Sequence, residues 1–269
     1  MIRLLAFIIC LPSMALPATS DQIARLYEAV GTEKLIQILS EEGMEQSEAL
    51  RMDMFPGRGG VGWSATVSTI YDATRLKTLF VTEFEAELEG TDVKGLLDFY
   101  ASELGSRVSL LEVEARRAFM SDEVEKAAVL AFERLKESGS DRLELLEQLA
   151  DTTGWIDRNV AGALNSNLAF YQGLASGQGF EMTEDQMLSD VWGQEEGIRE
   201  DTTDWVFGFM TFAYETLSDD ELRAYTMLTA SDAGRDLNRA LFAGYDAIFM
   251  EVSYELGAAA SLFSMGDEL

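Results

Sequence analysis

The chain has 269 residues, 47% of them hydrophobic, which is enough for a sizeable core in one large or two small domains. Its 48 acidic residues against 20 basic ones give a formal net charge of −28, which disfavours binding to nucleic-acid phosphates and to anionic lipid surfaces. The sequence contains no histidine, so the commonest general base and the commonest metal ligand are both missing.

The N-terminus, residues 1–18, has the pattern of a secretory signal peptide. Arg3 supplies the positive start, residues 4–11 form an apolar run that is too short to span a bilayer, and small residues follow up to an expected cleavage after Ala18. Cys10, the only cysteine, lies in this segment, so the mature chain would have no disulfide and no thiol nucleophile. Since no later apolar run reaches ~18 residues without a charge, we expect an exported protein with no transmembrane segment once the signal is removed.

The first half of the mature chain reads as a series of amphipathic helices, because apolar residues recur every three or four positions. A short helix covers residues 21–30, and a second follows Thr32 to about Met52. The later segments with helical spacing are residues 64–88 with a break near Asp72, residues 92–105, residues 106–120, and residues 122–138 with Ser121 as a candidate cap.

Residues 55–63, FPGRGGVGW, give the strongest loop signal in the chain. A glycine-rich loop can bind phosphate through its backbone amides, but here no strand precedes the loop and no Gly-Lys-Ser/Thr follows it. Arg58 alone would supply positive charge. We therefore expect a flexible linker rather than an anion site.

The second half begins after residues 138–140, Ser-Gly-Ser, which form the best candidate boundary. The segments with helical spacing are residues 141–150, 155–174, 182–192 and 199–217, followed by a stripe at Leu237, Leu241, Tyr245, Ile248, Val252 and Leu256. Residues 155–174 are mostly apolar and predict a central, well-buried helix. We expect Asn159, Asn165 and Asn167 on it to face solvent or to make packing hydrogen bonds rather than to form a site. No segment shows the alternation of a strand, so the fold class is all-α.

Residues 217–241 predict a helical hairpin, with Ser218 and Glu221 forming a capping box and Ser231 capping a second, longer helix. Gly234 would let the two backbones approach closely. A weaker copy lies 129 residues earlier (234 minus 105), where Ser102 and Gly105 occupy the same positions. This pattern predicts a tandem duplicated helical repeat, with half 1 at 19–138 and half 2 at 139–269 packed together; chance similarity between acidic amphipathic helices is the alternative.

The two hairpins resemble the DUF2059 family, exported helical proteins of Gram-negative bacteria whose pattern is an acidic capped helix running into FYxSPxGxxL. The first hairpin reads FYASELGSRV at 99–108, and the second reads LTASDAGRDL at 228–237 within the similar hairpin at 217–260. Both keep Ser and Gly, Glu103 and Asp232 replace the usual Pro, and the second lacks Phe-Tyr. The resemblance implies a helical fold and a periplasmic location, and it assigns no activity.

The sequence offers no catalytic, cofactor-binding or metal-binding residue. It lacks a nucleophile elbow, a Ser-x-x-Lys motif in a fitting context and the spacing of an EF-hand loop. We therefore expect a non-catalytic interaction or accessory protein with an unidentified protein partner. The alternatives are a binder of a small apolar or lipidic ligand between helices and, less favoured, a hydrolase using paired carboxylates. Homo-oligomerisation is left open.

Overall fold

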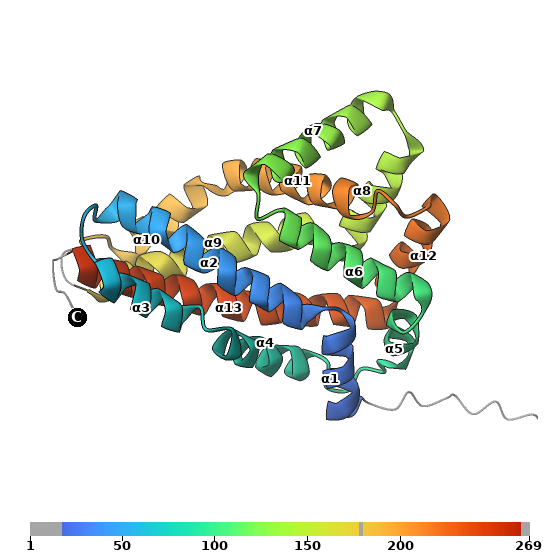
Figure 1. The fold of residues 1–269 in the computed structure, drawn as a ribbon, viewed down its shortest axis with the longest axis horizontal. Helices are drawn as coiled ribbons and strands as arrows, with labels where there is room; N and C mark the ends of the chain where they lie inside the picture. Colours follow the sequence, from blue (N-terminus) through green and yellow to red (C-terminus); the bar gives the residue numbers. More distant parts are fainter. Residues whose placement is uncertain (1–17, 178–179, 265–269) are drawn as a thin grey trace, which may run out of the picture.

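The computed structural model describes residues 18–177 and 180–264, so the predicted signal peptide lies outside the described residues except for Ala18. The described chain contains α-helices and no strand, which confirms the all-α fold class (Figure 1). The helices are α1 (Ser20–Ala29), α2 (Thr32–Met54), α3 (Gly60–Ile70), α4 (Ala73–Glu87), α5 (Lys94–Tyr100), α6 (Glu103–Ala118), α7 (Asp122–Ser138), α8 (Asp141–Thr153), α9 (Trp155–Ser176), α10 (Glu184–Gly193), α11 (Glu195–Ala213), α12 (Asp219–Thr229) and α13 (Asp232–Ser264).

The long helix α13 runs along much of the molecule and packs most extensively against α9 and α4 (Figure 1). Its contact with α9 is unusually close because each helix presents a glycine to the other. A Cβ atom at Gly173 would lie 2.0 Å from the carbonyl oxygen of Tyr254, and one at Gly257 would lie 2.1 Å from that of Phe170. The two backbones therefore touch, and this contact fixes α9 and α13 as a pair.

Two large hydrophobic clusters form the core. The first joins α1–α5 to α13 and the end of α9, and it uses residues between 23 and 100 together with Leu174 and residues between 237 and 263. The second joins α6, α7, α8, α11 and α12, and it uses residues between 108 and 150 and between 206 and 225. Each cluster therefore contains residues from both predicted halves. The tandem duplication itself stays a prediction.

The two predicted hairpins have the same local geometry where their helices meet. In α5–α6, the Ser102 hydroxyl donates to the Phe99 carbonyl (2.6 Å) and accepts from the Gly105 amide (3.1 Å). In α12–α13, the Ser231 hydroxyl donates to the Leu228 carbonyl (2.6 Å) and accepts from the Gly234 amide (3.0 Å). The prediction that Ser231 caps the longer helix is therefore confirmed, and Ser102 does the same for α6, which begins at Glu103 rather than at residue 106.

The glycine-rich segment at 55–63 differs from the flexible linker that we expected. Phe55 and Trp63 are buried, and both rings pack against Phe263 of α13. Arg58 donates a hydrogen bond to the Ser264 carbonyl (2.6 Å), and α3 already begins at Gly60. The segment is a tight turn whose two aromatic ends are held in the core, because aromatic burial stabilises it more than its glycines loosen it.

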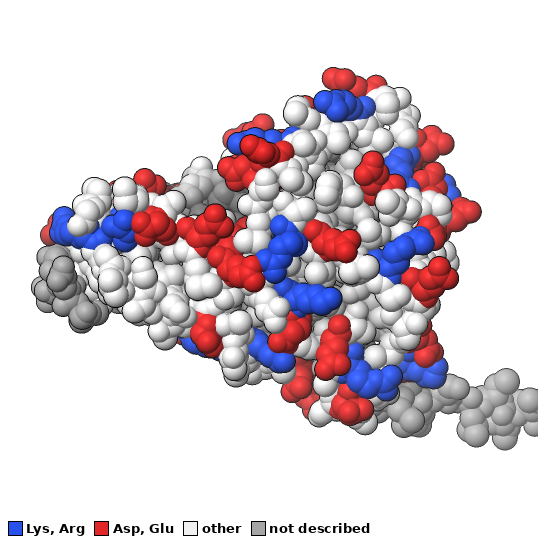
Figure 2. Space-filling model, viewed as in Figure 1, with Lys and Arg blue, Asp and Glu red and all other residues white. Residues whose placement is uncertain are grey.

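The surface carries many local ion pairs. On the face shown in Figure 2, basic side chains lie beside acidic ones. Several pairs join different helices, including Arg107 of α6 with Glu221 of α12 and Arg142 of α8 with Asp219 at the start of α12. Within residues 18–177 and 180–264, no helix has both the length and the apolar character needed to cross a membrane.

Candidate ligand cavity

A cavity of about 1310 Å³ lies between α2, α6, α7, α9, α11 and α13. Among the lining residues, Leu39, Leu241 and Tyr245 pack against the first hydrophobic cluster, Phe209 belongs to the second, and Trp155 and Trp205 pack against the second. The cavity therefore occupies the junction where the two clusters meet without filling the space. Its volume exceeds the ~300–1,000 Å³ typical of small-molecule sites.

Apolar and aromatic side chains form most of the cavity wall. Trp205 stacks on Phe209 with ring centroids 5.3 Å apart, and both lie on α11. Leu130 of α7 and Phe249 of α13 line the more open side and are 49% and 40% exposed. Soluble proteins seldom leave so much contiguous apolar surface uncovered without a function for it.

Helix α9 contributes one wall of the cavity, so it is not buried on all sides. The sequence pattern predicts a well-buried helix, and α9 differs from that expectation on its cavity side. One face packs on α13, and another borders the cavity through Gly162, Ala163 and Ser166. Asn159 and Asn167 also line the cavity, but each side-chain amide is already used inside the protein. Asn159 donates to the Trp155 carbonyl (2.7 Å), and Asn167 donates to Gln194 Oε1 (3.0 Å).

Glu112 on α6 carries a more deeply buried carboxyl than the other lining acid with a shifted pKa, Asp246. The Oε1 atom of Glu112 accepts hydrogen bonds from the hydroxyls of Tyr214 (2.6 Å) and Tyr225 (2.8 Å), which come from the end of α11 and from α12. Burial raises the pKa of Glu112, and the two hydrogen bonds partly oppose this effect. The cluster fixes this carboxyl at the boundary between the second hydrophobic cluster and the cavity.

Glu112 also has one oxygen free. No hydrogen bond to its Oε2 atom is formed within the described part of the chain, and Oε2 is not shielded from solvent. Glu112 is also a lining residue of the cavity. Its accessible second oxygen is thus a fixed hydrogen-bond acceptor in a lining that is mainly apolar.

Arg116 and Tyr245 flank Glu112 in the lining. The Arg116 guanidinium forms a hydrogen-bonded ion pair with Glu42 of α2, and both side chains are largely buried. The Tyr245 hydroxyl is shielded from solvent and has no hydrogen-bond partner among the described residues. Burial raises the pKa of Tyr245, the positive charge of Arg116 opposes that change, and the negative charge of Glu112 adds to it.

A second polar group, Asp246, lies in the wall on α13. Burial raises the pKa of this carboxyl, and the positive charge of Arg158 opposes the change. Arg158 itself lies over the Phe242 ring, with its guanidinium carbon 5.4 Å from the ring centroid. Both arginines that border the cavity are therefore engaged, Arg116 by Glu42 and Arg158 by Phe242 and Asp246.

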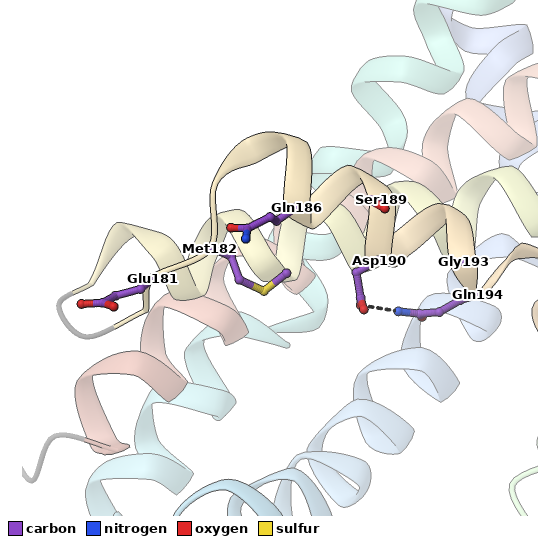
Figure 3. A pocket seen from close by; sticks show the side chains of 7 residues that line it. All are labelled: Glu181, Met182, Gln186, Ser189, Asp190, Gly193 and Gln194. Atoms are coloured by element: carbon purple, nitrogen blue, oxygen red, sulfur yellow. Dashed lines mark hydrogen bonds between the residues drawn. The ribbon is translucent and has the colours of Figure 1, made fainter.

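A smaller, shallow hollow of about 570 Å³ lies beside α10 (Figure 3). Its side chains do not converge on one point. Asp190 and Gln194 hydrogen-bond to each other (3.0 Å), while Glu181 lies at the far end of the segment. This hollow offers no enclosed space for a ligand, and the cavity between the helices is the better candidate.

The sequence did not identify the cavity or its polar groups. Glu112 was one of 48 acidic residues, and only its position in an apolar stripe of α6 could have marked it. Within the described ranges, no group of three or more Asp, Glu, Cys or His side chains is placed to hold a metal ion.

Comparisons with protein-family models, with curated proteins and with solved structures find no match to this chain. The resemblance to DUF2059 therefore depends on the residues of the two hairpins alone, and the functional argument depends on the cavity.

Proposed function

We propose that the protein binds a small apolar or lipidic molecule in the cavity between α2, α6, α7, α9, α11 and α13. The observation that carries this proposal is the cavity itself, with about 1310 Å³ of space bordered mainly by apolar side chains. An apolar ligand there would remove both its own surface and the cavity wall from water, at roughly 25 cal/mol per Å² of apolar surface buried.

The cavity is a partly open space that six helices border. Its wall includes Phe209, which is only 7% exposed, so an apolar ligand seated there would be shielded from water on that side. A small molecule with an apolar body is therefore the occupant that we propose. The expected signal peptide and the DUF2059 resemblance would place this binding in the periplasm of a Gram-negative bacterium. Both remain predictions.

The test uses N-phenyl-1-naphthylamine, an uncharged dye that fluoresces when it enters an apolar site. Trp155 and Trp205 line the cavity, so bound dye should accept excitation energy from them. Ala163 also lines the cavity, whereas Ala161, on the same helix α9, is exposed and does not. Ala163→Trp should fill the space and reduce dye affinity at least ~10-fold, and Ala161→Trp should bind as the wild type does.

Equal dye binding by both variants would contradict the proposal, as would an absence of saturable binding by the wild-type protein. Native mass spectrometry of the purified protein gives an independent measurement. It should show a co-purified mass that organic extraction removes and that the Ala163→Trp variant carries at lower occupancy.

A further inference from the structure

The polar end of the cavity is suited to a ligand group that donates hydrogen bonds. Glu112 Oε2 is an acceptor without a partner in the described chain, and it is held in place because Oε1 accepts from Tyr214 and Tyr225. A carboxylate fixed in this way loses little entropy when it accepts one more hydrogen bond. When Glu112 is ionised, its free oxygen can only accept a hydrogen bond.

The local charge favours a cationic donor. Around this end lie Glu112, Arg116 and Glu42, and the ion pair between Arg116 and Glu42 leaves the Glu112 charge uncompensated. Among the other charged lining residues, acidic side chains outnumber basic ones: Glu125, Asp201, Asp204 and Asp246 against Lys126 and Arg158. The charged lining residues as a whole would therefore repel a negatively charged ligand head group and attract a positively charged one.

The Tyr245 hydroxyl is not available to such a ligand, because it is shielded from solvent and so from the cavity. The partner of the ligand head is therefore the accessible oxygen of Glu112, and an ammonium group has the hydrogen-bond donors to meet it.

Together these observations support one assignment, which builds on the proposed function. We infer that the cavity binds a cationic amphiphile, an alkyl amine with its hydrocarbon chain along the apolar wall and its ammonium group at Glu112. Arg116 does not turn the site toward carboxylate ligands, because its guanidinium already pairs with Glu42. The head group is thus selected by one carboxylate and the body by the aromatic wall.

The test compares three ligands that share a ten-carbon chain: decylamine, decanol and decanoate, each below the concentration at which it forms micelles. Displacement of N-phenyl-1-naphthylamine reports their affinities for the wild type and for two variants. Glu112→Gln keeps an oxygen for both tyrosine hydroxyls and removes the charge. Glu114→Gln is the matched control, because Glu114 lies on the same helix, is exposed and does not line the cavity.

The wild type should bind decylamine at least ~10-fold more tightly than decanoate, with decanol between them, as expected for a hydrogen bond to a charged group. Glu112→Gln should lose that factor for decylamine and keep its affinity for decanol. Glu114→Gln removes the same charge from the protein and should behave as the wild type, which excludes non-specific attraction to an acidic chain.

The inference is overturned if decanoate binds the wild type as tightly as decylamine, or if a folded Glu112→Gln variant retains the amine preference. The proposed function would survive either result, because dye and decanol would still bind. If neither the dye nor any of the three ligands binds, the proposed function fails and the inference fails with it. If Glu112→Gln is unstable, the wild-type ligand series still tests the inference, because decanoate binding as tight as decylamine binding contradicts it.

Discussion

The hairpins α5–α6 and α12–α13 share a junction and differ in what their second helices carry. At both junctions a serine caps the second helix, and a glycine three residues later touches the backbone of the first. Beyond the junction the helices differ in length, since α6 has 16 residues and α13 has 33. The shared part is local backbone geometry, and the difference lies in the environment that each long helix enters.

Equivalent positions of the two hairpins meet at the cavity with different chemistry. Glu112 and Arg116 of α6 line it, and the residues 129 positions later, Leu241 and Tyr245 of α13, line it too. One hairpin thus supplies a charged pair, and the other supplies an apolar residue and an aromatic one. At these four positions the charged groups come from α6 and the apolar and aromatic ones from α13, while Asp246 adds a further carboxyl on the α13 side.

Substitution of the two junction glycines should have the largest effect on stability. A Cβ atom at Gly234 would lie 2.0 Å from the Leu228 carbonyl oxygen, and one at Gly105 would lie 2.1 Å from that of Phe99. We expect Gly234→Ala and Gly105→Ala each to lower the free energy of unfolding by about 3 kcal/mol, measured by urea denaturation, because the backbone must move apart.

Gly95 in α5 is the control for this prediction. A Cβ atom there meets nothing within 4 Å, so Gly95→Ala should leave stability unchanged or raise it by up to ~1 kcal/mol through helix propensity. If alanine at one junction glycine costs as little stability as alanine at Gly95, the two hairpins do not share a close-packed junction.

Glu112→Gln should change the pH dependence of stability. Burial raises the pKa of Glu112 in the folded protein above the value near 4.5 expected in the unfolded chain. Below pH ~4.5 the carboxyl is protonated in both states. Between the two pKa values the unfolded chain loses the proton first, so the wild type should lose stability as pH rises through this range.

The measurement is the difference in melting temperature between the wild type and Glu112→Gln from pH 4 to pH 8. The melting temperature of the wild type, relative to that of Glu112→Gln, should be highest at the acidic end of this range and should fall toward neutral pH. Above the folded-state pKa of Glu112 the difference should stay constant. A difference that does not vary with pH would show that Glu112 titrates alike in both states. Glu114→Gln serves again as the exposed control.

The capping serines should give the smallest effect and the closest match between the hairpins. Ser102→Ala and Ser231→Ala each remove a hydroxyl that accepts from a glycine amide, so each should cost about 1 kcal/mol in urea denaturation. They share no partner, and the double variant should lose the sum. If only one of the two substitutions lowers the free energy of unfolding, the two junctions share a backbone shape but not the stabilising contribution of the serine.

Much of the fold follows from short-range patterns in the sequence. The capping box of Ser218 and Glu221 is present as predicted, and Asp72 caps α4 at the break expected between the helices of residues 64–88. The segment at 55–63 differs from the flexible linker that its glycines predict, because the aromatic residues at its two ends are buried. Burial of Phe55 and Trp63 depends on Phe263, more than 190 residues away.

The cavity and its polar end could not be predicted in the same way. The stripe from Leu237 to Leu256 marked the inner face of α13 correctly, yet Leu241 and Tyr245 on it face unfilled space while Ile248 and Val252 are packed. Helical period shows which residues turn inward, not whether other helices fill the space opposite them.

The helical fold class, most helix boundaries and the shared serine–glycine junctions follow from the amino-acid sequence, because those features depend on interactions within a few residues of the backbone. The cavity that six helices leave between them follows only from the way the helices pack. The same is true of Glu112, which among many similar acids is held by Tyr214 and Tyr225, 102 and 113 residues away in the chain. Those features depend on how distant helices are placed relative to one another, which no local pattern encodes.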